Sequence, residues 1–320
     1  MAADRPLVSI GMPLYNAAGK LERSLALIRN QTYDNLDIIL SDNASTDATP
    51  EICAAAARED SRIRYVRNAE NIGPIANFNA ARRLKRGELF AWAAHDDEKA
   101  PEFIAETVAA LLANPNAVMS CTHATLITRE GESLLRPYSE AIASPLVEER
   151  VGSFVRETHV GIPFYGLFRS AALDALGDVD PWLDTDRRYL FRAVLRGPFV
   201  VVPKVLFRFR LFRSADDYVA MGFKMRPGAA DFDLDLYRHF ADLISEAGFD
   251  PATERRAVRS MRDALATYLD NRATYLISRL LADGASRGAK ARRLVAYARQ
   301  YPPLAQKRIF WGALRRVLAA

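Results

Sequence analysis

The 320-residue sequence contains only two cysteines and four histidines. Cys53 lies in a helical pattern and Cys121 in an apolar run, and the histidines lack the paired spacing of a zinc site. We therefore expect two buried thiols in a reducing compartment and no zinc centre.

Long apolar segments are also absent. No stretch approaches the roughly 20 apolar residues that a membrane-spanning helix requires, and residues 1–6 lack the apolar core of a signal peptide. No tract is of low complexity and no repeat recurs at a fixed period, which argues against a long disordered arm and a solenoid. We expect a cytoplasmic globular protein.

Glycine-rich phosphate loops are the third absence. A dinucleotide-binding fold would place G-x-G-x-x-G after the first strand, but residues 11–16 read Gly-Met-Pro-Leu-Tyr-Asn, and no P-loop occurs anywhere. No serine-centred nucleophile elbow is present either. A site that binds phosphates would therefore rely on a metal ion.

Strand and helix patterns alternate through the first hundred residues. Strands are predicted at residues 7–12, 36–40, 62–66 and 89–94, and helices begin near residues 20, 49, 74 and 101. This alternation predicts an α/β fold with a parallel, doubly wound sheet. Later elements are predicted as a strand pair within 117–128, strands at 164–168, 199–202 and 205–207, and a helix at 189–195.

Beyond residue 214 helical periodicity dominates, so we predict a catalytic domain at 1–214 and a helical region at 215–320. The segment from Arg279 to Arg316 contains ten Lys or Arg residues and one acid, so its net charge is +9. Because the whole chain carries +5, the remainder carries 5 − 9 = −4. This distribution favours contact with anionic lipid or an acidic partner and argues against nucleic acid. An amphipathic pattern at 304–318 fits either a helix on a membrane surface or one packed on the body.

Polar clusters follow three of the predicted strands, at residues 13–16, 41–43 and 95–98. A single acid after a strand is more often a helix cap than a ligand site. Ligands of open α/β sheets gather beyond the carboxyl ends of the strands, so three clusters at one edge indicate a binding site.

The adjacent acids Asp96 and Asp97 carry the most specific chemistry among these clusters. Neighbouring carboxylates repel each other unless a cation or hydrogen-bond donors compensate. A hard divalent ion held by one or two carboxylates and by substrate phosphates is a common solution. The alternative is a solvated turn that caps the helix opening near Pro101.

Residues 8–16, 31–33 and 38–49 resemble the start of the family 2 glycosyltransferases. The resemblance continues through 62–65, 71–73 with Asn79, 87–90 and 95–97, and it covers roughly residues 6–112. It implies a Rossmann-like GT-A fold, a nucleotide-diphosphate sugar donor, Mg²⁺ or Mn²⁺, and inversion at the anomeric carbon.

The resemblance also implies roles for residues that bind the nucleotide sugar. Pro13 and Tyr15 would flank the base, with the Tyr15 ring as a stacking surface and Asn16 beside it. Asp42 would accept a hydrogen bond from the base, usually a uracil N–H, which favours a UDP-sugar.

Further roles are implied around the diphosphate and the sugar. Gly73 and Asn79 would contribute to the donor site, and Asp96 would reach the ribose or sugar. Asp97 matches the last position of the metal-binding D-x-D motif, whose first position is His95 here.

An inverting transfer needs a base to deprotonate the acceptor hydroxyl. The family places this acid at the start of a helix in the second half, where Asp184 and Asp186 lie, and Asp186 is the preferred candidate. Alternatively these acids only cap that helix and favour its positive end.

Two positions depart from the family pattern. The histidine that often follows the final strand is missing from residues 207–213, where Arg210 or Arg213 would hold the diphosphate unless the run is simply an amphipathic edge strand. Phe78 replaces an arginine often found there. Residues 161–169 resemble the acceptor-side segment, in which Gly166 would allow close approach of a ligand.

These features predict a metal-dependent inverting glycosyltransferase with a glycan or lipid-linked acceptor in surface polysaccharide or glycolipid synthesis. It would be cytoplasmic, with peripheral membrane contact through its basic end. One alternative is a sugar-phosphate nucleotidyltransferase, which needs a basic glycine-rich loop that residues 13–15 do not supply. The other is a non-catalytic sugar-nucleotide-binding or assembly protein.

Overall fold

The computed structural model describes residues 5–96, 98–128, 131–157, 161–182, 184–210 and 232–282, although not the side chains of 232–235, 238, 266 and 268–282. The chain divides into two units, residues 1–227 (unit 1) and 228–320 (unit 2). This division and the boundary predicted after residue 214 both fall within residues 211–231, outside the described part of the chain.

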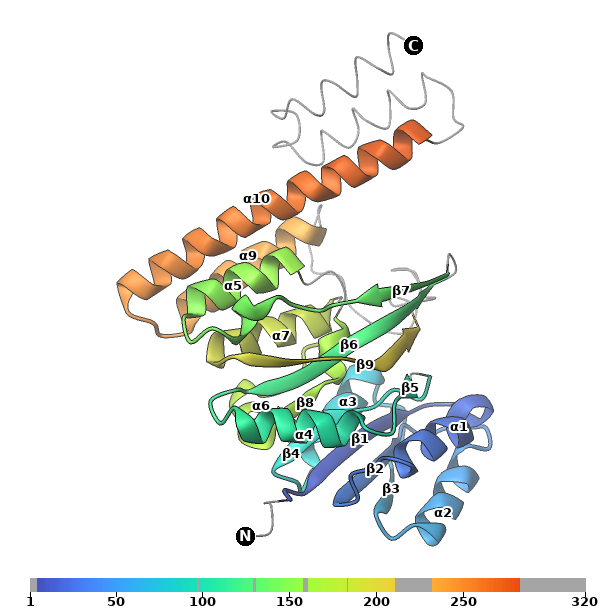
Figure 1. The fold of residues 1–320 in the computed structure, drawn as a ribbon. Helices are drawn as coiled ribbons and strands as arrows, with labels where there is room; N and C mark the ends of the chain where they lie inside the picture. The colour runs from blue at the N-terminus through green and yellow to red at the C-terminus, as the bar shows by residue number, and fades with distance from the viewer. Residues whose placement is uncertain are drawn as a thin grey trace. The chain divides into compact units, whose positions relative to one another are not determined.

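Unit 1 is built on a nine-stranded sheet flanked by helices (Figure 1). Its first half is parallel and has the order β3-β2-β1-β4. The strands of this half are β1 (Val8–Leu14), β2 (Leu36–Asp42), β3 (Ile63–Arg67) and β4 (Leu89–Trp92). The helices between and after them are α1 (Ala18–Arg29), α2 (Thr49–Glu59), α3 (Pro74–Arg83) and α4 (Phe103–Ala113). The predicted doubly wound α/β sheet is confirmed.

The second half of the sheet mixes directions, with β8 antiparallel to both β4 and β6, and β9 parallel to β6. Two strands lie at its margins, where β5 pairs with β9 and β7 pairs with β6. These strands are β5 (Glu98–Lys99), β6 (Met119–Thr128), β7 (Gly131–Leu135), β8 (Leu167–Arg169) and β9 (Phe199–Arg210). Its helices are α5 (Val147–Glu157), α6 (Ser170–Leu176) and α7 (Thr185–Arg196), with short 3₁₀ helices η1 (Glu140–Ala143) and η2 (Ile162–Tyr165).

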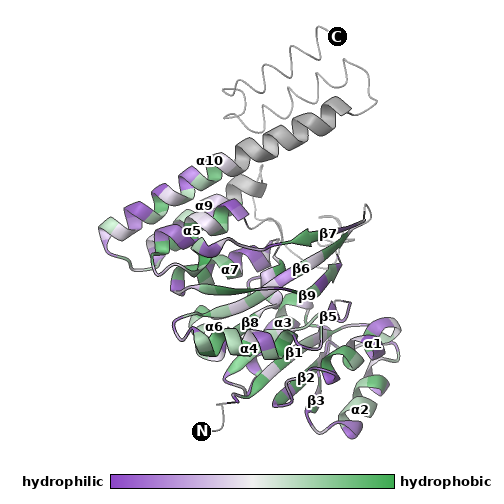
Figure 2. Cartoon of the chain, viewed as in Figure 1, coloured by the Kyte–Doolittle hydropathy of each residue, from purple (hydrophilic) through white to green (hydrophobic). Residues whose placement is uncertain are grey.

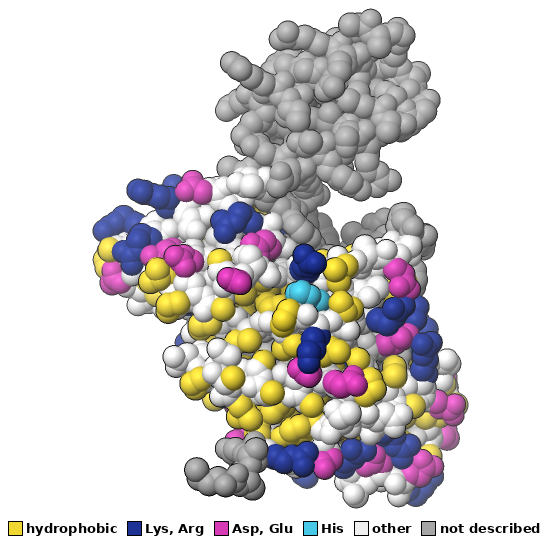
Figure 3. All heavy atoms as spheres, in the orientation of Figure 1, with side chains coloured by type: hydrophobic (Ala, Val, Ile, Leu, Met, Phe, Trp, Pro, Cys, Tyr) yellow, Lys and Arg dark blue, Asp and Glu magenta, His cyan; other side chains and the backbone are white. Residues whose placement is uncertain are grey.

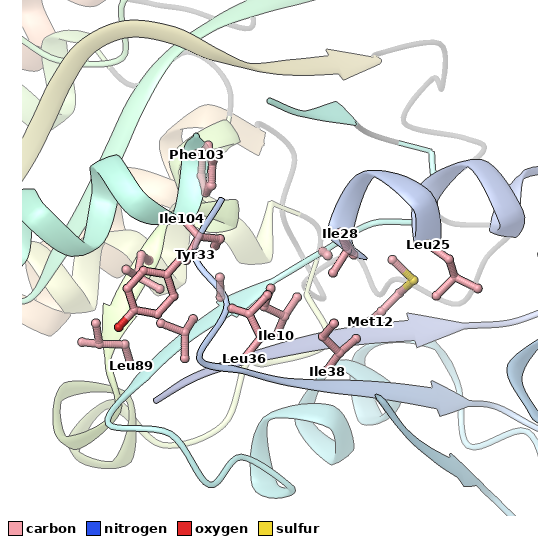
Figure 4. Packing of buried hydrophobic residues seen from close by; sticks show 14 of the residues in the cluster. Ile10, Met12, Leu25, Ile28, Tyr33, Leu36, Ile38, Leu89, Phe103 and Ile104 are labelled. Carbon is pink, nitrogen blue, oxygen red and sulfur yellow. The ribbon is translucent and has the colours of Figure 1, made fainter. Parts of the chain in front are cut away.

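Helices cover both faces of β1 and β2, and every residue of these two strands is buried. Ile10 and Met12 lie beside Leu25 and Ile28 of α1 (Figure 4). Gly11 between them faces the other way, because a Cβ there would lie 3.2 Å from Cβ of Ala81 in α3. Burial on two faces explains the continuous apolar runs of these strands, which are mostly green in Figure 2.

The later half of the sheet departs from the predicted elements. Residues 117–128 form one strand, β6, rather than a pair, and its hairpin partner is β7. The strands predicted at 199–202 and 205–207 are a single strand, β9. It slips in register against β6 around Pro203, since Thr122 pairs with Val202 and His123 pairs with Val205. Proline lacks the N–H of a sheet ladder, so this irregularity accommodates it.

The strand predicted at 164–168 is also only partly correct. Residues Ile162–Tyr165 form the 3₁₀ helix η2, and the strand β8 begins at Leu167. Pro163 at the start of η2 lacks a ladder N–H, which favours a turn of helix there over an extended strand.

In unit 2 the described residues form two helices, α9 (Phe232–Glu246) and α10 (Pro251–Ala282), which contact each other. They agree with the predicted helical region. The amphipathic pattern at 304–318 and most of the basic segment 279–316 lie outside the described residues. Within the described part of the chain, no helix is both long and apolar enough to cross a membrane.

Basic and acidic side chains lie side by side on the face of unit 1 that Figure 3 shows, and many such side chains form ion pairs. Examples are Arg5 with Asp34 and Lys204 with Glu106, each 2.6 Å apart and exposed. Exposed pairs of this kind contribute about 0–1 kcal/mol each, whereas one fully buried Leu or Ile contributes about 1.5–3 kcal/mol. Burial of the apolar core therefore contributes more than these exposed ion pairs to holding the strand ends in place.

Candidate functional site

The three predicted polar clusters meet at one edge of the sheet. In the parallel register Leu14 pairs with Asp42, and Asp42 pairs with Arg67. Backbone bonds continue past the strand ends, from Asn43 N–H to the Leu14 carbonyl and from Ala93 N–H to the Gly11 carbonyl, 2.8 and 2.9 Å long. The carboxyl ends of β1, β2 and β4 thus place their following loops beside one another, as the sequence predicts.

Tyr15 and Asn16 form the loop that leaves β1. Asn16 has left-handed backbone (φ 48°), which asparagine tolerates better than most residues. Its N–H donates to Ser45 Oγ and its side-chain oxygen accepts from Thr46 N–H, each at 2.9 Å. Pro13 is buried within β1, whereas the Tyr15 side chain is 47% exposed. The loop is rigidly tied to its neighbour, yet it presents one aromatic ring to solvent.

Asp42 lies at the end of β2 with no exposed surface. One carboxylate oxygen accepts from Ser45 N–H and the other from the Tyr65 hydroxyl, both at 2.9 Å, and Arg67 Nε lies 3.2 Å away. Burial and the bond to Asp42 raise the pKa of Tyr65 above its ordinary value. The visible role of Asp42 is to hold the 42–45 turn and Arg67, and its predicted contact with a base stays a prediction.

Asn43 organises the loop that precedes α3. Its side-chain oxygen accepts from Ile72 N–H at 2.9 Å and from Asn68 Nδ2 at 3.1 Å. Its amide nitrogen donates to the Asn71 side chain at 2.7 Å and to the Gly73 carbonyl at 3.3 Å. Gly73 takes φ 85° and ψ 160°, a conformation almost confined to glycine. This asparagine network was missed from the sequence, where the only signal is the density of asparagines from 68 to 79.

Asn79 lies away from this loop, on the buried face of α3. Its side chain donates to the Val179 carbonyl at 2.8 Å and accepts from Val179 N–H at 2.9 Å. These two bonds give the amide a structural role, because they tie α3 to the segment before α7. The donor contact predicted for Asn79 stays a prediction.

The acidic turn leaves β4 beside the start of the chain's first helix. The Ser24 hydroxyl donates to the His95 carbonyl, and Lys20 Nζ lies 3.9 Å from the Asp96 carboxylate. Asp97, the predicted metal ligand, lies outside the described residues. Asp96 supplies a carboxylate of the type that Mg²⁺ and Mn²⁺ prefer, which is one of the ligands that such an ion would need at this turn. No cluster of three metal-binding side chains occurs among the residues that the structure describes.

Glu98 follows the turn and pairs with arginines from two distant elements. Its carboxylate lies 2.7 Å from Arg23 of α1, 2.6 Å from Arg210 and 3.7 Å from Arg208 of β9. Burial tends to raise the pKa of Glu98, but the bond from Arg210 and the charge of Arg23 lower it overall. Arg210 is thereby placed at the acidic turn, whereas Arg213 lies outside the described residues. The sequence did not reveal these pairs, because Arg23 and Arg210 lie 75 and 112 positions away along the chain.

The two candidate bases occupy different surroundings at the start of α7. Asp184, with φ 65°, lies 3.0 Å from the guanidinium of Arg187. Asp186 accepts from Arg187 N–H at 2.8 Å and its carboxylate lies against Gly161, where a Cβ would come within 1.7 Å of it. Burial raises the pKa of Asp186, and Arg187 only partly opposes this effect. The structure thus separates a charge-paired acid from a desolvated one.

Aromatic packing fixes residues 161–169, the segment predicted to lie on the acceptor side. The Phe164 ring stacks on Trp92 of β4 at 4.4 Å and 12°, and Tyr189 of α7 meets Trp92 edge-on at 5.7 Å. Phe78, which replaces the family's arginine, lies 6.1 Å from Phe164 in the same cluster. A Cβ at Gly166 would come within 2.5 Å of the Ser120 carbonyl, so packing against β6 requires this glycine.

Comparisons with known proteins identify the family and the fold of the chain. Residues 9–177, more than half of the chain, match the family model described as glycosyl transferase family 2. An uncharacterized glycosyltransferase from Haemophilus influenzae is 32% identical over 125 residues, 39% of this chain and 39% of the relative. The chain therefore spans well under two thirds of that curated relative.

Two solved structures share the fold. S. aureus TarS 1–349 in complex with UDP-GlcNAc has a TM-score of 0.60 and 16% identity, covering 81% of this chain and 72% of that one. The mannosyltransferase PcManGT from Pyrobaculum calidifontis, in complex with GDP-Man and Mn²⁺, has a TM-score of 0.53 and 18% identity, covering 99% and 86%. The sheet and its helices are thus GT-A-like, and the chain belongs to glycosyl transferase family 2.

Proposed function

We propose that this chain transfers a sugar from a nucleotide-diphosphate donor to a hydroxyl acceptor, with inversion at the anomeric carbon. The observation that carries the proposal is the arrangement of Tyr15, Asp96 and Asp186. An exposed ring and an acidic turn follow strands at one edge of the sheet, and a desolvated carboxylate begins a helix of the second half. Family membership and neighbours that bind UDP-GlcNAc or GDP-Man support it.

The nucleotide would bind beside the loops after β1 and β2. The ring of Tyr15 offers a stacking face, and such stacking is worth about 1–3 kcal/mol per base. Asp42 and Asn43 hold the surrounding loops in place through the hydrogen bonds described above. A uracil base, and hence a UDP-sugar, is the preferred donor.

The diphosphate would lie at the acidic turn. Asp97, with Asp96 beside it, would hold Mg²⁺ or Mn²⁺, and the bound ion supplies positive charge to a leaving diphosphate. Arg210, which Glu98 holds beside the turn, would add a guanidinium for phosphate oxygens.

Asp186 would act as the general base. Its carboxylate takes the proton of the acceptor hydroxyl as that oxygen forms a bond to the anomeric carbon. The bond from that carbon to the diphosphate oxygen breaks on the opposite side, and the nucleoside diphosphate leaves. Because burial raises the pKa of Asp186, its carboxylate is a better proton acceptor than an ordinary exposed one.

A donor panel tests this proposal. Purified protein with Mn²⁺ or Mg²⁺ is offered UDP-, GDP- and dTDP-sugars together with glycan and lipid-linked acceptors, and nucleotide release and product are measured. The proposal expects metal-dependent turnover with one donor class and its loss in Asp97→Ala. Tight nucleotide binding without turnover on any pair would instead indicate a sugar-nucleotide-binding protein. Release of pyrophosphate from a nucleoside triphosphate would indicate a nucleotidyltransferase.

The acceptor is proposed to be a glycan or a lipid-linked sugar of surface polysaccharide or glycolipid synthesis. The net charge of +9 from Arg279 to Arg316 would hold the chain at an anionic membrane surface. Sedimentation with anionic vesicles, compared with neutral vesicles and repeated at high salt, tests this part separately. Equal sedimentation with both vesicle types would contradict it.

A further inference from the structure

Lys99 is a buried basic residue that directly follows the acidic turn at 95–98 in the chain. It forms β5 with Glu98 and is only 6% exposed. Lysine is rarely buried unless its charge is compensated, because removing an ammonium group from water is costly. A lysine at this position therefore needs partners that compensate its positive charge.

Its partners include two backbone carbonyls and two aromatic rings. Lys99 Nζ donates to the Trp92 carbonyl at 2.9 Å and to the Tyr165 carbonyl at 2.8 Å. The same nitrogen lies 4.5 Å from the centre of the Phe103 ring and 5.3 Å from that of Phe207. Desolvated contacts of a cation with aromatic faces are favourable, so the site is built for a positive charge.

The two carbonyls belong to segments that lead to different parts of the candidate active site. Trp92 ends β4, three residues before the turn that begins at His95. Tyr165 ends η2, and Gly161 at the other end of this short helix lies against the Asp186 carboxylate. Lys99 is thus bonded at once to the strand that carries the donor-side turn and to the segment that borders the candidate base.

Apolar packing alone would join these segments less specifically. The Trp92–Phe164 stack also connects β4 with η2, but ring contacts are less directional than hydrogen bonds. Replacing the ammonium with a methyl group would leave the Trp92 and Tyr165 carbonyls without this donor. Two short bonds from one nitrogen fix where the two carbonyls lie relative to each other.

We propose that Lys99 is a positioning residue that sets the spacing between the donor-side turn at 95–98 and the candidate base Asp186. The inference rests on the proposed transferase function. Loss of Lys99 would leave the loops around Tyr15 and Asp42 unchanged but would misalign acceptor attack on the bound donor. A misplacement near 1 Å can cost about 100-fold in rate.

Lys99→Met tests the inference by comparing two reactions of the same donor. With acceptor present, transfer is expected to fall about 10- to 100-fold, while donor affinity stays within about threefold. Hydrolysis of the donor by water depends less on acceptor alignment, so the ratio of hydrolysis to transfer should rise. Lys99→Arg keeps a cation with several N–H donors and should recover part of the transfer rate.

Arg150→Met is the matched control. Arg150 is also buried, and its guanidinium donates to the carbonyls of Ser144 and Pro145 and of Val194, which lies near the end of α7 opposite to Asp186. Its loss should lower the melting temperature and leave the ratio of hydrolysis to transfer unchanged. Circular dichroism and donor titration show whether each variant is folded.

An unchanged ratio in a folded Lys99→Met protein that binds donor would overturn the inference, and so would an equal rise in Arg150→Met. If Lys99→Met does not fold, the ratio of hydrolysis to transfer in Lys99→Arg tests the inference. The longer, planar guanidinium should still raise this ratio above that of the wild type, and an unchanged ratio would overturn the inference. A wild-type protein without any transfer would refute the proposed function itself. The failure of one is therefore distinguishable from the failure of the other.

Discussion

The two halves of unit 1 surround their candidate site acids, Asp42 and Asp186, in different ways. Asp42 is buried among donors, with Ser45 N–H, the Tyr65 hydroxyl and Arg67 around its carboxylate. Asp186 is partly exposed and lies against the backbone of Gly161, and desolvation raises its pKa.

Hydrogen bonds to a carboxylate hold it in place, whereas desolvation makes it take up a proton more readily. The first arrangement suits a rigid surface on which a ligand binds, and the second suits proton transfer. This difference supports the proposal that the first half (the nucleotide side) binds the donor and the second half (the acceptor side) carries out the proton transfer. Variants on the nucleotide side should then change affinity, and variants on the acceptor side should change rate.

The largest effect is expected for Asp186→Asn, because general-base catalysis contributes about 10²- to 10⁴-fold to a rate. The turnover number should fall by that order while donor affinity changes little. In the wild type, protonation of Asp186 should end activity as the pH falls, at a higher pH than for an ordinary carboxylate, because its pKa is raised. Steady-state rates and donor titration across pH measure both effects.

Asp186→Asn should also be more stable than the wild type at neutral pH. A carboxyl whose pKa is raised by folding stabilises the protein below its unfolded pKa, and this stabilisation is lost as the pH rises through the folded value. The gain at neutral pH should be of the order of 0.5–2 kcal/mol. Asp184→Asn is the control, since Asp184 is paired with Arg187. An equal or larger loss of rate in Asp184→Asn would reverse the assignment.

The second-largest loss of activity is expected for Gly161→Ala. The added Cβ would come within 1.7 Å of the Asp186 carboxylate, so one of the two must move. We expect a 10- to 100-fold lower turnover number, on the order of the cost of a small misplacement, with unchanged donor affinity. Gly19→Ala is the control, because nothing lies within 4 Å of a Cβ at that helical position. Normal activity in a folded Gly161→Ala protein would show that Asp186 does not take part in the reaction.

The first half of the fold could be predicted from the sequence because its signals are local. The apolar runs at β1, β2 and β4 are each followed at once by polar residues, and a parallel sheet brings such ends together. The loops carrying Tyr15 and Asp42 were therefore predicted beside each other without knowledge of any distant contact.

The second half could not be predicted as well, because its geometry depends on partners far along the chain. Glu98 meets Arg210 across 112 positions, and Lys99 meets the Tyr165 carbonyl across 66. Neither pair leaves a periodic signal in the sequence. Likewise β7 has an exposed run, and it is a strand only because it pairs with β6.

Tyr15→Ala tests nucleotide binding, and its effect is expected to be the third largest. Loss of a stacking ring should weaken donor and nucleoside-diphosphate binding about 5- to 150-fold, equivalent to about 1–3 kcal/mol. The turnover number at saturating donor should change little, which is the opposite of the Asp186→Asn pattern. Calorimetric titration with UDP and GDP measures the change. Tyr15→Phe keeps the ring and should bind normally, and equal weakening in both variants would contradict stacking.

The smallest effect is expected for Tyr65→Phe, which removes one of the donors around Asp42. Loss of this hydroxyl should lower the unfolding free energy by about 1 kcal/mol. Nucleotide affinity should fall a few-fold, because the 42–45 turn is less firmly held. Because the pKa of Tyr65 is raised, its hydroxyl still donates near pH 10, so wild-type affinity should show no titration from this group up to that pH.

Tyr33→Phe separates the effect on the site from the effect on the fold. The buried Tyr33 hydroxyl donates to the Pro6 carbonyl at 2.6 Å, at the opposite end of the sheet from Asp42. This variant should lose similar stability in a denaturant titration yet bind nucleotide like the wild type. If Tyr65→Phe and Tyr33→Phe weaken nucleotide binding equally, the donors around Asp42 serve the fold alone, and the rigid nucleotide side has no special part in affinity.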